Sequence, residues 1–295
     1  MTLSLRRAAS ERRARTRAAT LSKKTRRTKL LTDLGLAVLS LTVLFPFYLV
    51  LVTALKSDNR VSENPLGLPD VWHWGVFRQA WDQGHFGSYF MNSVYVVVPV
   101  VLAVLAGSLM AAYAFATMRF RGRGILFAIL VAGLTIPLEI IVTPLFYEML
   151  HLGLLDTLWA LILPQIAINL PFGVLLLRAF IGDLPRDLMD AGRMDGCGQF
   201  RLLTRVVLPL CRPALLSLLV FTFMWTWNQF LLPLIMVQSD SVRTLPIGLS
   251  YFQGRYVSEL PLMMAGVTIT FLPIMVVYLF FQRQIIRGIT TGAGK

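Results

Sequence analysis

Charged residues are scarce in this sequence, and acidic residues most of all. Asp, Glu, Lys and Arg make up 15% of the 295 residues, whereas an ordinary soluble domain contains about 25%. Hydrophobic residues make up 56%, and the mean hydropathy is +0.67. This composition argues against a soluble globular protein and favours one that lies in a membrane.

Residues that serve catalysis or metal binding are also rare. The three histidines lie far apart in the sequence and lack the spacing of metal ligands: His73, His85 and His151. The two cysteines, Cys197 and Cys211, have no histidine nearby, and we expect them in a reducing compartment where a disulfide is disfavoured. No Gly-x-Ser-x-Gly motif occurs. We therefore expect no catalytic residue and no metal site.

The sequence also lacks a nucleotide-binding loop. Residues 288–295 resemble one at first sight, but the spacing differs by one residue and no Ser or Thr follows Lys295. Within the apolar runs there is no pair of acidic residues and no acid–lysine pair, which argues against a proton-coupled secondary transporter. We expect this chain itself to bind neither ATP nor another cofactor.

Six apolar runs are long enough to cross a membrane. A helix needs about 20 residues to span a hydrocarbon layer of about 30 Å. The runs cover residues 30–55, 90–118, 125–150, 155–180, 213–237 and 261–281. Helices of a large soluble core are the alternative, which six such runs in one chain disfavour. The sequence therefore predicts an all-α membrane protein with six transmembrane helices.

The distribution of charge predicts the orientation of these helices. The first 29 residues contain eleven Lys or Arg and one acid, Glu11, and Lys or Arg also prevail after the second, fourth and sixth runs. Because such segments stay on the cytoplasmic side, we expect both termini there. A nucleic-acid-binding arm would carry interleaved aromatics, and a cleaved signal peptide would have a shorter apolar run. The basic tail therefore indicates contact with anionic lipid, with no nucleic-acid partner.

Glu139 is an acidic residue within the third apolar run. If 125–150 is one continuous helix, this carboxylate lies about 21 Å from Ile125, in the outer half of the bilayer. A carboxylate at that depth usually faces a cavity, where it would accept hydrogen bonds from a substrate hydroxyl. The alternative is a carboxylate near the outer interface that is hydrogen-bonded to a neighbouring helix.

Uncharged polar residues occur in the fourth and fifth runs. Gln165 and Asn169 are four residues apart, on one face of a helix. The fifth run contains an aromatic and amide patch of Trp225, Trp227, Asn228 and Gln229. Aromatic rings with amide partners suit the apolar face and the hydroxyl rim of a sugar. Hydrogen bonds between helices are the alternative role. Our candidate substrate-pathway residues are Glu139, Gln165, Asn169, Trp227 and Asn228.

A polar segment separates the fourth and fifth runs. Asp183 and Pro185 are typical of a helix start, and Gly196 is typical of a helix stop. Leu184, Leu188, Ala191 and Gly192 would share one narrow face. The small residues on that face would let another protein approach closely, although a helix lying on the membrane surface is the alternative. A second amphipathic stretch, 200–208, then leads through Pro209 into the fifth run.

The spacing in this segment resembles a known signature. Asp190-Ala191-Gly192, three residues, Gly196, nine residues, Val206, one residue and Leu208-Pro209 follow one another. This order resembles the EAA signature of ABC importer permeases, Glu-Ala-Ala-x3-Gly-x9-Ile-x-Leu-Pro. The sequence departs from it by having Asp for Glu, Gly for Ala and Val for Ile, and each change keeps the charge or the approximate size.

Further landmarks resemble the carbohydrate, maltose-type branch of these permeases. They are Pro46-Phe47-Tyr48, Lys56-Ser57, Phe90-Met91-Asn92-Ser93, Met194-Asp195-Gly196, Trp227-Asn228-Gln229-Phe230, Leu245-Pro246-Ile247-Gly248-Leu249 and Gly288-Ile289-Thr290-Thr291-Gly292-Ala293. Their order and spacing cover almost the whole chain beyond the basic tail.

The resemblance implies a fold and a role. It implies the type I importer permease fold over 30–286, with a cytoplasmic tail at 1–29, a cytoplasmic coupling segment at about 183–210 and a second tail at 287–295. The residues implied in coupling to the ATPase are Asp190, Ala191, Gly192, Asp195, Gly196, Leu208 and Pro209. We expect Ala191, Gly192 and Gly196 to make the close fit, and Asp190 and Asp195 to make cap or ion-pair contacts.

The resemblance also implies partners. The chain would form half of a pathway for a sugar or oligosaccharide in the bacterial cytoplasmic (inner) membrane, together with a second permease, which makes a heterodimer. A cytoplasmic ATPase dimer would use ATP and Mg, and an extracytoplasmic solute-binding protein would deliver the substrate. The chain would work by alternating access. A permease for an amino acid or a peptide, and an ATPase-independent secondary transporter, are the alternatives.

Overall fold

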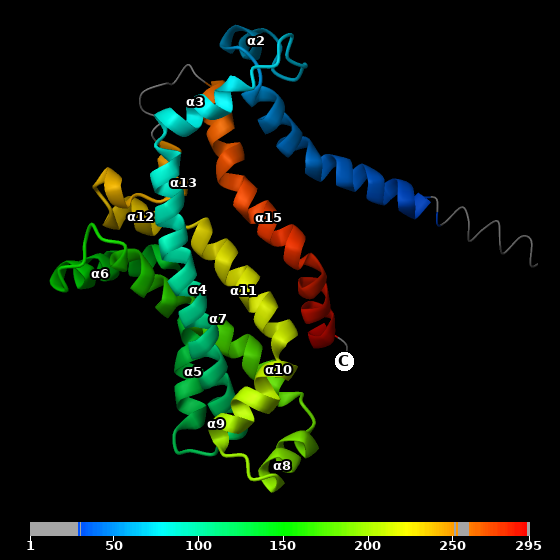
Figure 1. Cartoon of the computed structure of the whole chain (residues 1–295), viewed down its shortest axis with the longest axis vertical. Helices are drawn as coiled ribbons and strands as arrows, with labels where there is room; N and C mark the ends of the chain where they lie inside the picture. Colours follow the sequence, from blue (N-terminus) through cyan, green and yellow to red (C-terminus); the bar gives the residue numbers. More distant parts are fainter. Residues whose placement is uncertain (1–28, 30, 251, 253–259, 294–295) are drawn as a thin grey trace, which may run out of the picture.

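The structure is a computed structural model that describes residues 29, 31–250, 252 and 260–293. Every regular element among the described residues is a helix, as the sequence predicts (Figure 1). Residues 1–28 of the basic tail, and Lys295 at the end of the candidate nucleotide-binding loop, lie outside the described residues.

Four helices are each long and apolar enough to cross a membrane. They are the N-terminal helix Leu31–Ala54, α4 (Phe86–Thr117), α7 (Trp159–Gly182) and Leu260–Gln282 of α15 (Leu260–Ala293). Two further pairs of helices, Arg123–Gly133 with Leu138–His151 and Gln199–Leu210 with Arg212–Trp227, are each bent at a short break and are long and apolar enough together to count as one span. Counting each pair once, the described residues contain up to six spans, in agreement with the six apolar runs.

The third apolar run is bent rather than continuous. α5 (Arg123–Gly133) and α6 (Leu138–His151) meet at an angle of 102°. Pro137 precedes α6, and a proline disfavours helical geometry in the residue before it. The prediction of one helix over 125–150 is therefore wrong, and with it the depth inferred for Glu139. That residue lies in the first turn of α6, beyond the bend.

The fifth apolar run is preceded by a bend and is interrupted within. Before the run, Gln199–Leu210 and α11 (Arg212–Trp227) meet at 78°. Within the run, α11 ends at Trp227, and a separate short helix, α12 (Leu231–Met236), begins four residues later. Pro233 has no N–H to bond the Gln229 carbonyl, and the Asn228 amide donates to the Met224 carbonyl at 2.9 Å. A helix through 213–237 is therefore not formed.

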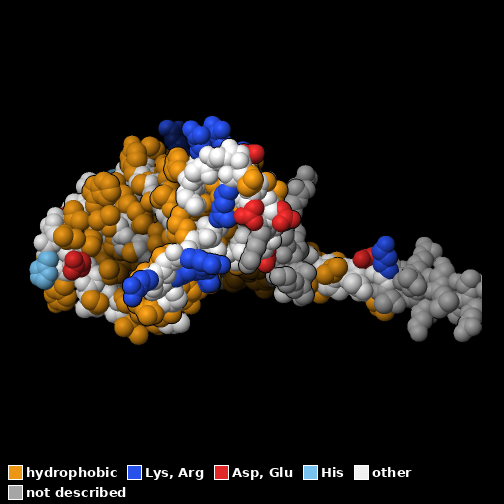
Figure 2. All heavy atoms as spheres, turned by 90° about the horizontal axis from the view of Figure 1, so that it is seen from below, with side chains coloured by type: hydrophobic (Ala, Val, Ile, Leu, Met, Phe, Trp, Pro, Cys, Tyr) orange, Lys and Arg blue, Asp and Glu red, His pale blue; other side chains and the backbone are white. Residues whose placement is uncertain are grey.

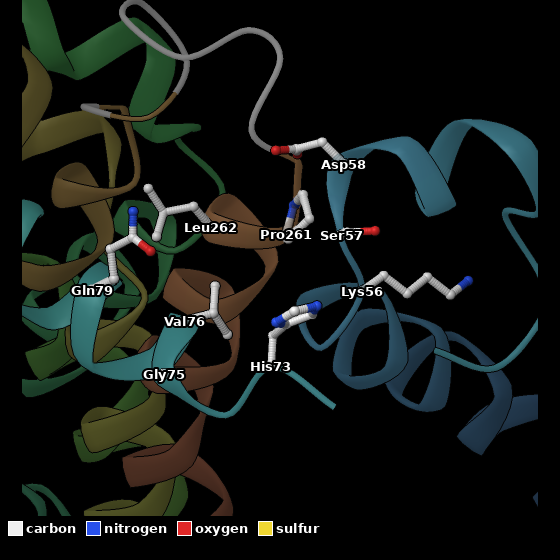
Figure 3. A pocket seen from close by; sticks show the side chains of 9 residues that line it. All are labelled: Lys56, Ser57, Asp58, His73, Gly75, Val76, Gln79, Pro261 and Leu262. Atoms are coloured by element: carbon white, nitrogen blue, oxygen red, sulfur yellow. The ribbon is translucent and has the colours of Figure 1, made fainter. Parts of the chain in front are cut away.

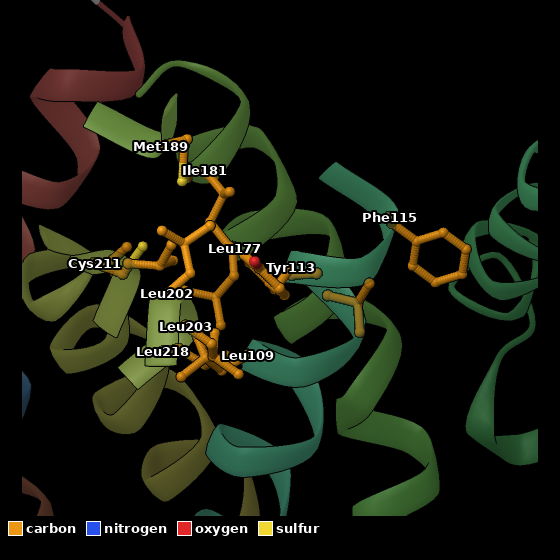
Figure 4. Close-up of a cluster of buried hydrophobic side chains, with 14 residues drawn as sticks. Leu109, Tyr113, Phe115, Leu177, Ile181, Met189, Leu202, Leu203, Cys211 and Leu218 are labelled. Atoms are coloured by element: carbon orange, nitrogen blue, oxygen red, sulfur yellow. The ribbon is translucent and has the colours of Figure 1, made fainter. Parts of the chain in front are cut away.

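The centre of the bundle is α4, which packs along α7 and α11. Small residues let α4 and α7 approach: a Cβ on Gly173 would lie 2.2 Å from Ser108 Oγ, and one on Gly107 would lie 2.9 Å from Leu170 Cδ1. Such close approach is typical of membrane helices, where packing replaces the hydrophobic effect. Figure 4 shows the buried cluster that α4, α7 and the coupling segment share, around Leu109, Leu177, Leu202 and Leu218.

The bundle has two poles (Figure 1). One pole carries α8 (Arg186–Met194), α9 (Gln199–Leu202) and the turn between α4 and α5. The opposite pole carries α2 (Asp58–Glu63), α3 (Gly75–Gln83) and α13 (Leu245–Gly248). Figure 2 looks onto the α8 pole and shows groups of Lys and Arg side chains on this face.

Candidate functional site

The polar segment between the fourth and fifth runs forms a short helix, α8. It begins at Arg186, after Pro185, and ends at Met194. Gly196 has a φ of +75°, a left-handed conformation that glycine adopts without a steric cost. The Cys197 N–H donates to the Gly192 carbonyl at 2.9 Å, which closes the helix end. The predicted helix stop at Gly196 is thereby confirmed.

The two sides of α8 have different surroundings. Met189 and Gly192 are buried, three residues apart on one side, whereas Ala191 is exposed. A Cβ on Gly192 would lie 2.6 Å from Leu202 Cδ1, so this glycine lets α8 pack on the following helix. The expectation that Gly192 shares an outward docking face with Ala191 is therefore wrong. Ala191 is left as the small residue on the outer side of α8.

Two charged side chains of α8, Asp190 and Arg193, form an ion pair with each other. Arg193 Nη1 donates to Asp190 Oδ1 at 2.9 Å, one turn apart. Both side chains are largely exposed, and such surface pairs contribute about 0–1 kcal/mol. Asp195 occupies the C-cap position and is exposed. The helix thus presents a small side chain bordered by charged ones.

A buried connection joins α8 to the transmembrane helix α11. α9 continues into a π-helical turn, Leu203–Val207, and a last short turn, α10 (Leu208–Leu210). Leu202 and Val207 are fully buried, while Pro209 is exposed. The Tyr113 hydroxyl of α4 donates to Gln199 Oε1 at 2.6 Å. Leu208, which is half-buried against the same cluster, therefore belongs to a packed path from α8 to α11, whereas Pro209 lies on its surface.

A pocket of about 360 Å³ lies at the bend of the third run. It is lined by Gly133, Leu134, Ile136, Gln165, Ile168, Asn169, Phe172, Trp225, Asn228 and Gln229. These residues come from the end of α5, the middle of α7 and the end of α11. The structure thus brings together Gln165, Asn169 and Asn228, three of the five residues that we selected for the substrate pathway.

Two buried amides face this pocket from α7. Gln165 is 3% exposed and Asn169 is 7% exposed. The Asn169 amide donates to the Gln165 main-chain carbonyl at 2.7 Å. The Gln165 side chain makes no hydrogen bond to any residue that the structure describes. Since buried amides are normally paired, this one is available to a ligand or to water.

An aromatic wall stands beside the amides. The rings of Phe172 and Trp225 are 4.9 Å apart at 73°, and the Phe221 ring lies 5.9 Å from Trp225. Trp225 is 47% exposed, so a large part of its ring is open to the pocket and its surroundings. The combination offers an apolar surface next to hydrogen-bonding groups.

The other two candidate substrate-pathway residues, Trp227 and Glu139, lie outside this pocket. Trp227 is buried against Phe90 and Phe223, and its Nε1–H donates to the Thr270 carbonyl at 3.2 Å. This tryptophan holds α11 to α15 and does not line the pocket, so the structure does not bring it together with the other selected residues. Glu139 is exposed on α6 and does not line the pocket either.

Some residues that line the pocket could have been recognised from the sequence. Two residues apart on a helix differ by about 200°, so Trp225 and Trp227 could not both face one pocket. Gly133 and Pro137 are helix-breaking residues four apart, and they indicate the bend that exposes Leu134 and Ile136. Phe172 carries no sequence signal of its own.

Residues 237–245, here called the strap, are held at the opposite pole. The Asn92 amide donates to the carbonyls of Ser241 and Arg243 at 2.8 and 2.9 Å, and Ser93 Oγ accepts from the Leu245 N–H at 2.8 Å. Asp156, between α6 and α7, accepts from the main-chain N–H groups of Gln238 and Ser239, each at 2.8 Å, and from the Ser239 hydroxyl. These contacts connect parts of the sequence that lie far apart.

A second pocket of about 370 Å³ lies beside α2 and α3 (Figure 3). Its wall includes Lys56, whose amine donates to the carbonyls of Asn64 and Pro65 at 3.0 and 2.8 Å. Burial, with Arg60 nearby, lowers the pKa of Lys56. In Figure 3 the amine points away from His73 and Gln79. Lys56 therefore anchors the loop after α2, and its amine is directed to that loop rather than into the pocket.

Comparison with known proteins identifies relatives over most of the chain. Residues 103–291 match the family model of the binding-protein-dependent transport system inner membrane component. The diacetylchitobiose uptake system permease protein NgcG of Streptomyces coelicolor is 34% identical over 86% of this chain and 84% of that protein. The arabinooligosaccharides transport system permease protein AraQ of Bacillus subtilis is 34% identical over 88% of this chain and 92% of that protein.

A solved structure has the same fold. It is a bacterial ABC transporter involved in the import of the acidic polysaccharide alginate, with a TM-score of 0.74. The match covers 88% of this chain and 96% of the other, at 21% sequence identity. The predicted permease fold is therefore confirmed.

Proposed function

Because this chain belongs to the family of binding-protein-dependent transport system inner membrane components, and is a permease subunit of an ABC importer, we propose that it forms half of a sugar pathway driven by a cytoplasmic ATPase. The observation that carries this proposal is α8. It is a short exposed helix at one pole, its inner side is packed on Leu202, and a buried path joins it to α11. A force applied to α8 would therefore reach the pocket at the far end of α11.

The relatives support sugar as the substrate class. The two named above carry diacetylchitobiose and arabinooligosaccharides in their names, and another is a probable starch degradation products transport system permease protein, 32% identical over 90% of this chain. The pocket between α7 and α11 offers amides and an open tryptophan ring, which suit a saccharide. A permease for an amino acid would instead need charged partners for the ammonium and carboxylate.

The proposal includes three partners. A cytoplasmic ATPase dimer, which would use ATP and Mg, would receive α8. A second permease would complete the pathway. A solute-binding protein would dock at the pole opposite α8. A solved alginate ABC transporter in complex with its periplasmic protein, with a TM-score of 0.64 and 16% identity to this chain, supports such a partner. By the positive-inside rule, the α8 pole and both termini would be cytoplasmic, in the inner membrane.

The mechanism would be alternating access. Closure of the ATPase pair on ATP would draw the two coupling helices together. The path through Leu202 and Val207 would move with α8, because its side chains are fully buried and packed. α11 would then swing and turn the pocket outward, and ATP hydrolysis would reset the chain.

Ala191→Trp tests the coupling role. Ala191 is exposed and lies on the outer side of α8, so the larger side chain fits within this chain but would block a closely fitting partner. We expect ATP-driven uptake and substrate-stimulated ATPase activity to fall at least about tenfold, equivalent to about 1.4 kcal/mol. The melting temperature and membrane insertion should stay unchanged.

The matched control is Ala191→Ser, which changes the same exposed position and keeps the side chain small. It should leave the ATPase stimulation intact. Normal stimulation in Ala191→Trp, with the ATPase still bound to the complex, would show that α8 is not the coupling element.

A further inference from the structure

We propose that the pocket between α7 and α11 binds uncharged saccharides directly and rejects acidic ones. This inference rests on the proposed function and concerns the substrate class that this subunit's own pocket accepts. Among the ten described residues that line the pocket, none carries a charge.

The polar groups in the pocket match hydroxyl groups. Gln165 and Asn169 are both more than nine-tenths buried, and the Gln165 amide has no hydrogen-bond partner among the described residues. Asn228 and Gln229 add two more amides on the α11 side. A primary amide can both donate and accept, as can a sugar hydroxyl, so the two surfaces are complementary. The Gln165 amide borders the pocket without a partner from the described residues, so a sugar hydroxyl could bond to it without breaking an existing contact in the chain.

The apolar part of the pocket matches the face of a sugar ring. Trp225 is held edge-on by Phe172, with ring centroids 4.9 Å apart, and remains about half exposed. A pyranose or furanose ring presents C–H groups that pack on such a surface. The volume of about 360 Å³ lies at the small end of the usual range for ligand pockets, about 300–1,000 Å³. It therefore suits one or two sugar units at a time.

The residues that line this pocket offer no cation to the carboxylate of an acidic sugar. Its carboxylate would lose water without gaining a cation, and desolvation of an unpaired charge is unfavourable. Arg178, on the same helix as the amides, is held over the Phe127 ring at 3.7 Å and is not among the lining residues. The ionisable residue nearest in sequence to Ile136 is Glu139, which is itself negative. Both facts favour a neutral ligand.

The test measures protection of a thiol in the pocket. Asn228→Cys is introduced with Cys197→Ala and Cys211→Ala, and the full permease and ATPase assembly is reconstituted in nanodiscs without the solute-binding protein. Maleimide labelling is followed with diacetylchitobiose, arabinotriose or maltotriose, and with alginate trisaccharide or trigalacturonate at the same concentration. Ser62→Cys, exposed on α2, is the control thiol.

We expect a neutral sugar to slow labelling of the Asn228→Cys chain severalfold and to leave the control unchanged, while the acidic sugars protect neither. Equal protection by an acidic sugar would overturn the inferred selectivity. Protection by none of the five would overturn the assignment of the pocket. ATP-driven uptake by the complete system, measured with the same sugars, reports separately on the proposed function, which fails if no sugar is imported.

A second variant checks the amide itself. Gln165→Leu keeps the size of the side chain and removes its hydrogen-bonding groups. Uptake of the protecting sugar should fall about fivefold, as expected for one hydrogen bond of about 1 kcal/mol. Gln282→Leu, towards the C-terminal end of α15 and away from the pole that carries α2 and α3 (Figure 1), is the matched control and should transport normally. Equal transport by both variants would show that Gln165 does not contact the sugar.

Discussion

At the residue scale, Gly192 connects the coupling helix to the rest of the chain. It has no side chain, and Leu202 occupies the space that a Cβ would need. Because Leu202 is fully buried, it cannot move aside into solvent. The close packing of α8 thus depends on one missing methyl group, and the departure from the usual alanine at this position of the signature has a structural role.

Gly192→Leu should therefore destabilise the α8 pole. We expect a cost of about 1–3 kcal/mol from overpacking, seen as a lower melting temperature of the purified complex and as weaker ATPase stimulation. Ala191→Leu, one residue earlier and exposed, should leave the melting temperature unchanged. An unaltered melting temperature in Gly192→Leu would mean that α8 does not rest on Leu202.

At the element scale, the strap at 237–245 depends on groups from two other elements. Asn92 and Ser93 of α4 hold its end, and Asp156 holds its beginning. Two sequence landmarks of the carbohydrate permeases, Asn92-Ser93 and Leu245-Pro246, are joined by the hydrogen bond between Ser93 and Leu245. The structure thus supplies a physical reason for their joint occurrence.

Asp156→Ala should loosen the beginning of the strap. The variant loses two acceptor contacts to main-chain N–H groups, so the amides of Gln238 and Ser239 should exchange hydrogen faster with solvent. The same loss should follow acidification. The Ser239 hydroxyl, followed by the main-chain N–H groups, lowers the pKa of Asp156 below its ordinary value of 3.8.

The lowered pKa of Asp156 determines how the stability of the strap changes with pH. A carboxylate whose pKa is lowered by folding stabilises the strap fully at neutral pH and loses that effect as the pH falls through the lowered pKa. The protection of the Gln238 and Ser239 amides, measured as exchange relative to an unstructured peptide at the same pH, should therefore persist at neutral pH and be lost in the wild type as the pH falls through the lowered pKa of Asp156, and be weak throughout in Asp156→Ala. Identical profiles would remove Asp156 from this role.

At the scale of the whole molecule, the N-terminal helix Leu31–Ala54 stands away from the bundle (Figure 1). Its apolar side chains are exposed along most of its length, among them Leu34, Leu39 and Val43. Its ring contact with the bundle is near its end, where Phe47 and Phe271 lie 5.1 Å apart. Lipid covers such a helix readily, but a second permease would also fit against it.

A photo-crosslinking residue at Leu39 should attach to the partner permease in the intact importer. The same residue at Leu66, exposed beside α2 at the pole distant from α8, should not. The products are identified by mass spectrometry after digestion. Adducts with lipid alone at Leu39 would mean that the helix faces the bilayer and that the second permease packs elsewhere.

Several features of the fold could be predicted from local sequence. The lengths of the apolar runs predict the spans, and the conformational freedom of glycine predicts the helix stop at Gly196. The pairing of Gln165 and Asn169 on one face follows from helical periodicity. The bend before Glu139 could also have been predicted, because Gly133 and Pro137 lie within one run.

The sequence by itself determined the class of the protein and the apolar runs that form its long helices, and it predicted where a coupling segment would lie. These depend on local quantities: hydrophobic length, net charge and backbone conformation. Only the tertiary structure decided which side of α8 is free, which of Trp225 and Trp227 faces the pocket, and that Gln165 and Asn228 meet. Those outcomes depend on contacts between helices distant in the sequence, whose rotation is set by packing against neighbours rather than by any local pattern.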